Sequence, residues 1–108
     1  NLVKIIDTYL GQVPDFEKNI NKNIDNRDYE NLYFETHTML SSLRTIGVRE
    51  LVEIVENLNN AARQLTSFEI IEEINEDFER MHKIHLDKLR KESKKIKAEI
   101  KRLSSQAA

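Results

Sequence analysis

The sequence predicts an all-α protein folded as an antiparallel four-helix bundle, with a short leading helix and a long C-terminal helix. Three observations support this prediction. The chain of 108 residues contains only 2 Gly and 1 Pro, too few for the turns of a β-sandwich or barrel. Its apolar residues recur at steps of three and four, the spacing of an amphipathic helix. Its length suits one domain with one core.

The first apolar pattern runs from Leu2 to Leu10 and predicts the short leading helix. Gly11 and Pro14 follow, and we expect them to end this helix, because proline lacks a backbone N–H and clashes with the preceding turn. Since proline is tolerated in the first turn of a helix, a new helix is expected to begin near Pro14. It should end in the polar run 25–28.

Two more helices are predicted, on either side of Gly47, because glycine is favoured just past a helix C-terminus. The apolar residues of the first are Tyr29, Leu32, Thr36, Met39, Leu43 and Ile46. Those of the second are Val48, Leu51, Val55, Leu58, Ala62 and Leu65.

The last predicted helix is long, with acidic residues near its start and basic residues near its end, which suits the helix dipole. Its apolar stripe is expected to contain Ile71, Ile74, Phe78, Met81 and His85. Helical composition continues to about Leu103. We therefore expect one domain over residues 1–108, with an ordered core over 1–103 and a frayed tail over 104–108.

Composition excludes several classes of function. The absence of Cys excludes disulfides, thiolate metal sites and cysteine nucleophiles. A net charge of -2 gives no general attraction to nucleic acid or anionic membranes, and no apolar run approaches the ~18 to 20 residues of a membrane span. No signal-peptide pattern opens the chain, and it lacks an initiator Met. We expect a cytoplasmic, monomeric module of a larger chain, without nucleic acid or direct membrane contact.

The basic run near the C-terminus is interleaved with Glu92 and Glu99 and contains no aromatic residue for base stacking. A solvated helix end, or a helix that packs on a neighbouring domain, is therefore expected there rather than a nucleic-acid site.

His37 is the candidate for chemistry. It follows the predicted core residue Thr36 by one position, about 100° around the helix, so its ring edge should face water. Imidazole is partly neutral near physiological pH and can attack a phosphorylated partner. The residues predicted to surround it are Tyr33, Leu40, Ser41 and Arg44.

The run His37-Thr-Met-Leu-Ser-Ser-Leu-Arg-Thr-Ile-Gly47 resembles the motif of histidine-containing phosphotransfer (HPt) domains, His-x-Leu-Lys-Gly-(Ser/Ala)-x-x-x-(Ile/Leu)-Gly. The similarity extends outward to Ile6–Pro14, Asn26–Asp28, Val48–Leu51 and Leu58–Ala62. The resemblance implies a four-helix phosphorelay carrier. In such a carrier His37 accepts a phosphoryl group from the aspartate of one receiver domain and passes it to another.

The resemblance also implies a carrier that is not itself an enzyme, with no kinase or nucleotide site, although the parent protein is expected to be a hybrid sensor histidine kinase. No cofactor of its own is expected, and Mg²⁺ belongs to the partner receiver of the response regulator. Tyr33, Leu40, Ser41 and Arg44 are expected to bind that receiver.

Two residues depart from the HPt motif. Leu40 stands where the family has the Lys that helps hold the phosphoryl oxygens, and Ser41 stands where it has Gly. The alternative function is therefore a non-catalytic helical interaction module, either a degenerate HPt domain that docks receivers or a plain adaptor bundle.

The pair Glu79-x-x-His82, with His85, is half of the di-iron carboxylate pattern, which needs a second such pair. No second Glu-x-x-His occurs, so no metal site is expected. His85 is expected to be a histidine satisfied within or beside the core.

Overall fold

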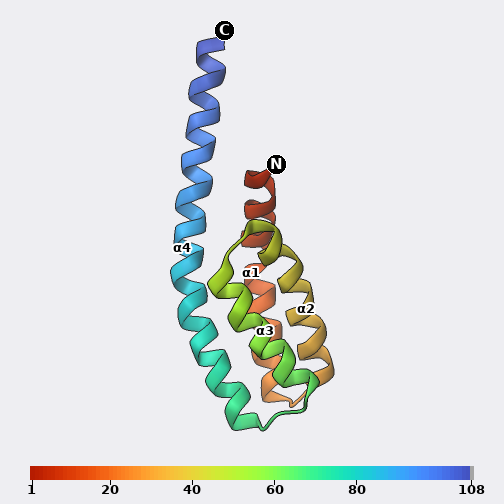
Figure 1. Ribbon diagram of the computed structural model, residues 1–108. Coiled ribbons are helices and arrows are strands. Elements are labelled where there is room, and N and C mark those ends of the chain that lie inside the picture. The colour runs from red at the N-terminus through yellow and green to blue at the C-terminus, as the bar shows by residue number, and fades with distance from the viewer. Residues whose placement is uncertain (108) are drawn as a thin grey trace.

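The computed structural model describes residues 1–107 of the chain. Within them the chain forms four α-helices: α1 (Leu2–Asp25), α2 (Tyr29–Ile46), α3 (Arg49–Arg63) and α4 (Phe68–Ala107). This confirms the predicted all-α four-helix bundle with a long C-terminal helix. Successive helices run in opposite directions, and α4 rises well above the other three (Figure 1).

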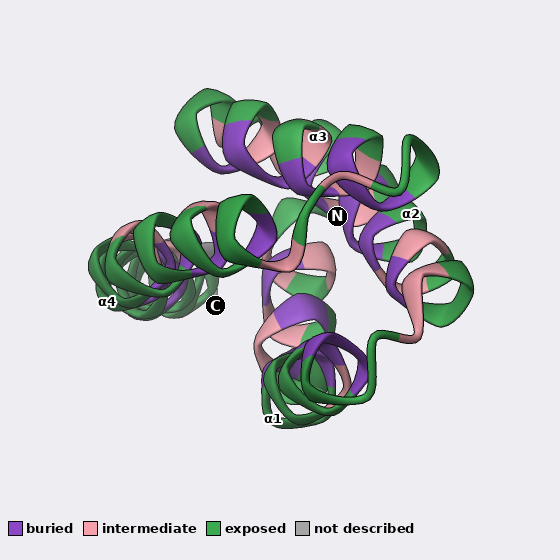
Figure 2. Ribbon diagram, turned by 90° about the horizontal axis from the view of Figure 1, so that it is seen from below, coloured by how far each residue is buried: buried purple, intermediate pink, exposed green. Residues whose placement is uncertain are grey.

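The four helices stand at the corners of a square, with their buried faces turned inward (Figure 2). Among the described residues, each helix packs against two neighbours: α2 lies between α1 and α3, and α4 closes the square between α3 and α1. The largest fully buried side chains are Tyr9, Phe78, Ile6, Ile20, Leu32, Met39, Leu43, Leu51, Leu58, Ile71, His82 and Val55. Burial of these side chains supplies most of the favourable free energy of folding.

The predicted break at Gly11 and Pro14 is wrong, because α1 continues through both residues. The short leading helix is the first part of this longer helix. Pro14 lies on the exposed side, while Val13 and Phe16 on either side of it stay buried. Packing of that continuous apolar stripe outweighs the roughly 3 kcal/mol that an interior proline costs a helix.

The turn between α2 and α3 forms as the sequence predicts. Gly47 adopts the left-handed conformation with φ 86°, and its N–H donates to the Leu43 carbonyl over 2.9 Å.

The C-terminal end of α3 differs from the prediction. The helix ends at Arg63, and Leu65 has a φ of 53° and is 72% exposed, so Leu65 is a turn residue rather than a core residue.

The long helix α4 extends to Ala107, and the frayed tail over 104–108 stays a prediction. Ala108, the last residue of the predicted frayed tail, lies outside the described residues. The buried stripe of α4 also differs from the prediction, because His82 is buried and His85 is only half-buried. The buried residues of α4 are Ile71, Asn75, Phe78, His82, Leu86, Leu89 and Ser93.

Candidate functional site

His37 lies near the middle of α2 and is exposed, as the sequence predicts, while its neighbour Thr36 is fully buried. The His37 ring stacks on the ring of Tyr33, one turn earlier, with 6.0 Å between centroids and 17° between planes. Within the described residues, neither ring nitrogen of His37 makes a hydrogen bond or an ion pair. The imidazole is therefore held on one side and open to solvent at its nitrogens.

The backbone beneath His37 is tied to α3. The Asn59 side-chain amide donates to the Thr36 hydroxyl over 2.9 Å and to the Tyr33 carbonyl over 3.1 Å. The Thr36 hydroxyl in turn lies 2.8 Å from the Leu32 carbonyl, to which it donates. These bonds fix the turn of α2 that carries His37. Sequence reasoning missed Asn59, whose only signal is a polar amide directly after the core residue Leu58.

Leu40 does not belong to the exposed surface around His37. Its side chain is only 3% exposed and packs in the core with Met39 and Leu43. A step of three residues moves a side chain about 60° back around the helix, which here is toward the buried face. Leu40 is therefore a core residue, which corrects the expectation that it contacts a receiver. At this position of the motif the chain has no ammonium group to hold phosphoryl oxygens.

Ser41 and Arg44 are both exposed. The Arg44 guanidinium donates to the Glu56 carboxylate of α3 over 3.1 Å. It is thus turned toward α3, and its Cα lies about 10 Å along α2 from that of His37. The structure places Tyr33, Ser41 and Arg44 on the same side of the domain as His37, with Arg44 already engaged.

Phe34 was not predicted to belong to this surface, yet it is 56% exposed and stands one turn before His37. Its ring makes an edge contact with the Tyr33 ring, at 5.6 Å between centroids and 72° between planes. The available signal was a Phe that stands three residues before the histidine and falls outside the predicted apolar stripe. Together Tyr33, Phe34 and His37 form an aromatic surface on α2.

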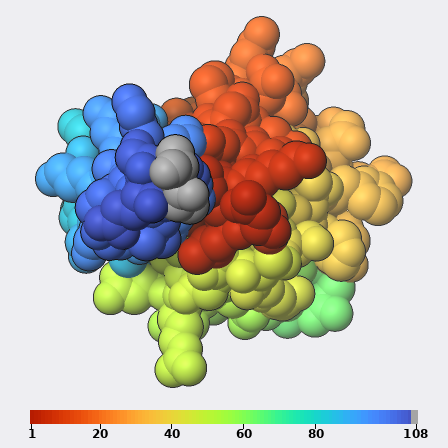
Figure 3. Space-filling model, turned by 90° about the horizontal axis from the view of Figure 1, so that it is seen from above, coloured from red at the N-terminus to blue at the C-terminus, as the bar shows by residue number. Residues whose placement is uncertain are grey.

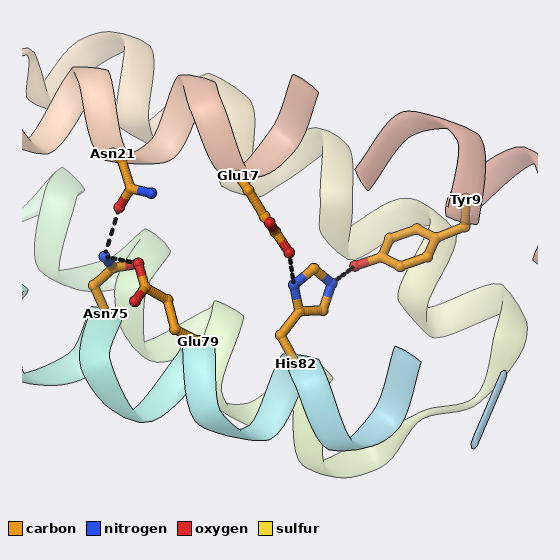
Figure 4. Close-up of polar contacts among 6 residues, drawn as sticks. All are labelled: Tyr9, Glu17, Asn21, Asn75, Glu79 and His82. Carbon is orange, nitrogen blue, oxygen red and sulfur yellow. Dashed lines mark hydrogen bonds and ion pairs between the residues drawn. The ribbon is translucent and has the colours of Figure 1, made fainter. Parts of the chain in front are cut away.

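The other two histidines have different surroundings. His82 is 1% exposed and lies between α1 and α4, where its Nε2 is 2.8 Å from the Tyr9 hydroxyl (Figure 4). His82 Nδ1 lies 3.2 Å from a Glu17 carboxylate oxygen, though without the alignment of a hydrogen bond. Burial, helped by the charges of Arg90 and His85, lowers the pKa of His82 to about 4.

His85 is half-buried and pairs with the Glu50 carboxylate of α3 over 3.0 Å. Among the described residues, no three His, Asp or Glu side chains are placed to hold a metal ion together. Of the three histidines in the described residues, only His37 has neither ring nitrogen in a hydrogen bond or an ion pair.

Across the described residues, none of the helices combines the length and the apolar character needed to cross a membrane.

Comparisons with curated proteins and with solved structures give no match. The family model of the Hpt domain matches residues 4–106, nearly the whole chain. Hpt domains carry a phosphoryl group on a histidine in phosphorelays, and they interact with the receiver domains of response regulators. With its four-helix bundle and its exposed histidine on α2, this chain belongs to the Hpt domain family.

Proposed function

We propose that His37 is the phospho-acceptor, and that the domain takes the phosphoryl group from the aspartate of one receiver domain and passes it to a second receiver. The observation that carries this proposal is the contrast among the histidines. His37 has both ring nitrogens open at the surface, whereas His82 is buried and His85 is paired with Glu50.

In the forward step a neutral ring nitrogen of His37 attacks the phosphorus atom of the receiver's aspartyl phosphate. A P–N bond forms, the P–O bond to the aspartate breaks, and the aspartate leaves as a carboxylate with the bonding electrons. Mg²⁺ bound by the receiver would neutralise charge on the transferred group. The Hpt domain contributes a positioned nucleophile, and the reverse step at a second receiver regenerates neutral His37.

The docking surface is centred on Tyr33 and Phe34 and edged by Ser41 and Arg44. An apolar, aromatic centre within a polar rim is the usual anatomy of a protein–protein contact. Leu40 supports this surface from beneath without reaching it, because it is buried. Exposed Phe34 supplies the apolar contact that Leu40 was expected to make.

A transfer assay with a phosphorylated receiver tests the acceptor. Acid-labile, base-stable label should appear on the wild-type domain and on His85→Gln, and should be absent from His37→Gln. Label that persists in His37→Gln would refute the assignment of the acceptor. Phe34→Ala should weaken receiver binding at least about fivefold while the thermal midpoint stays unchanged, since Phe34 is exposed.

A second function, docking of receivers without efficient transfer, is favoured by one observation. Among the described residues, the cation nearest along α2 to His37 is Arg44, and Arg44 is paired with Glu56. Phosphohistidine would then lack a charge-assisted hydrogen bond. The same assay distinguishes the two functions. A docking module would bind the receiver and would bind it more weakly in Phe34→Ala, but it would acquire no label.

A further inference from the structure

The threonine and serine hydroxyls of α2 differ in what they bond to. The three threonine hydroxyls each donate to a backbone carbonyl of the same helix, over 2.8 Å from Thr36 to Leu32, 3.0 Å from Thr38 to Phe34 and 2.9 Å from Thr45 to Ser41. The hydroxyls of Ser41 and Ser42 make no hydrogen bond with any described residue. Of these two serines, Ser41 is exposed and Ser42 is half-buried. The Ser41 hydroxyl therefore has a proton to donate to a group at the surface of the domain.

Ser41 stands one helical turn after His37. Residues four apart are neighbours on a helix surface, with about 5–6 Å between their Cβ atoms and about 40° between their directions, whereas Ser42 points about 140° away from His37. Side chains in a helix lean toward its N-terminus, so Ser41 leans toward His37. The same lean carries the Tyr33 hydroxyl away from His37, although the two rings stack. Among the described residues of α2, Ser41 is thus the unbonded donor that leans toward the imidazole.

A phosphoryl group on His37 would find no free cation on the C-terminal side of the histidine along α2. Leu40 is apolar and buried, and the Arg44 guanidinium is bonded to the Glu56 carboxylate over 3.1 Å. Phosphoryl oxygens are strong acceptors, and a hydrogen bond to an ionised acceptor is stronger than one between neutral groups. A hydroxyl next to the histidine can therefore supply part of the stabilisation that a cation would supply.

We propose that the Ser41 hydroxyl donates a hydrogen bond to the phosphoryl group carried on His37, in place of a cationic side chain. This inference rests on the proposed function of His37 as the phospho-acceptor. The hydroxyl keeps its proton, so it stabilises the transferred group without taking part in bond making. The contact forms on the side of the domain away from α4, whose projecting end leaves α2 uncovered (Figure 3).

Phosphorylation of the domain with phosphoramidate tests this donor without a receiver. Ammonia leaves as the new P–N bond forms, and phosphorus NMR then follows the phosphohistidine resonance against pH. The resonance that is absent from His37→Gln belongs to His37. A hydrogen bond to the phosphoryl oxygens favours the more highly charged form, so the titration midpoint should be lower in the wild type than in Ser41→Ala.

Two control variants accompany this titration. Ser42→Ala removes the other unbonded serine hydroxyl of α2, and Tyr33→Phe removes the Tyr33 hydroxyl but keeps the ring that stacks on His37. Both variants should titrate with the wild-type midpoint, because neither hydroxyl leans toward His37.

The equilibrium with a phosphorylated receiver gives a second measure. At concentrations too low for the two proteins to stay bound, the phosphorylated fraction reflects the stability of phosphohistidine and not the strength of docking. The ratio of phosphorylated to unphosphorylated domain should fall about two- to fivefold in Ser41→Ala, as expected for the loss of one hydrogen bond. The ratio should stay at the wild-type value in Ser42→Ala.

The two measurements separate failure of this inference from failure of the proposed function. Equal titration midpoints in the wild type and Ser41→Ala would overturn the inference, while label from a receiver on His37 would still support the phospho-acceptor. A shifted midpoint in Tyr33→Phe but not in Ser41→Ala would also overturn it, because Tyr33 would then be the donor. A lower midpoint in the wild type than in Ser41→Ala, with no label from a receiver, would support the hydrogen bond from Ser41 and contradict the proposed function.

Discussion

The Tyr9 hydroxyl and Nε2 of His82 lie 2.8 Å apart in the core and join α1 to α4. The Phe78 ring stacks on His82 with 4.6 Å between centroids, so the imidazole is enclosed by aromatic groups. Burial and the nearby Glu17 carboxylate also raise the pKa of Tyr9 well above its ordinary value. Both groups are therefore neutral partners in the folded domain at neutral pH.

This contact predicts a loss of stability in mild acid. The pKa of His82 is lowered from 6.5 to about 4 in the folded state, so the unfolded chain takes up a proton first as the pH falls. The stabilisation is complete above pH ~6.5 and is lost as the pH falls toward ~4, at a cost on the order of 3 kcal/mol. Urea unfolding at a series of pH values measures this change.

His82→Gln should flatten that pH profile between about 6.5 and 4.5, because the group that takes up the proton on unfolding is then absent. Below this window, carboxylates contribute, because Lys97 and Ser93 lower the pKa of Asp7 and His85 lowers that of Glu50. A profile in His82→Gln as steep as in the wild type would show that another group controls acid stability.

Leu40 should behave as a core residue. Leu40→Ala removes a side chain that is 3% exposed and should lower the free energy of unfolding by about 2–5 kcal/mol. Ser41→Ala, at the exposed position next to it, should change that free energy by less than about 0.5 kcal/mol. Thermal and urea unfolding measure both variants. An unchanged midpoint in Leu40→Ala would restore Leu40 to the docking surface.

Asn59 should stabilise the turn that carries His37. Asn59→Ala removes two donors from the Tyr33 carbonyl and the Thr36 hydroxyl, at an expected cost of about 1–3 kcal/mol. Asn60→Ala, one position along α3 and exposed, is the matched control and should cost much less. If both variants unfold alike, the two bonds contribute no net stability.

Release of Arg44 from Glu56 should favour phosphohistidine. Glu56→Gln removes the carboxylate that holds the guanidinium at 3.1 Å, and the freed cation can then turn toward a phosphoryl group on His37. The phosphorylated fraction at equilibrium with a receiver should rise about two- to fivefold, as expected for an exposed charge pair. Glu72→Gln removes the same charge from the exposed start of α4 and should have no such effect.

Pro14→Ala should stabilise α1. The substitution restores an N–H that can donate to the Leu10 carbonyl in a helix that is already continuous, with an expected gain of about 1–3 kcal/mol. Gly11→Ala should add about 0.5–1 kcal/mol, because a Cβ there meets no atom within 4 Å. A lower midpoint in Pro14→Ala would mean that the proline ring makes a packing contact of its own.

The sequence was sufficient for the helical architecture and the turn at Gly47, because local period and a left-handed glycine determine them. It failed where tertiary packing decided. Pro14 was accommodated because the apolar stripe of α1 is buried on both sides of it. On α4 the buried stripe steps by four twice in succession, from Phe78 to His82 to Leu86, which moves burial from His85 to His82.

The candidate site shows the same division. The exposure of His37 follows from its offset from Thr36, which is a local property. The burial of Leu40 depends on how the other helices close over that side of α2, and the bond from Asn59 joins residues 23 positions apart. No pattern within one helix reveals such a contact.

The square arrangement of the helices has a consequence for how the domain operates. Helices α2 and α4 occupy opposite corners and do not pack on each other within the described residues (Figure 2). A receiver that docks over His37 would therefore contact the corner of the bundle farthest from α4. The long last helix is left out of that contact, so a change in what α4 packs against need not alter the surface around His37.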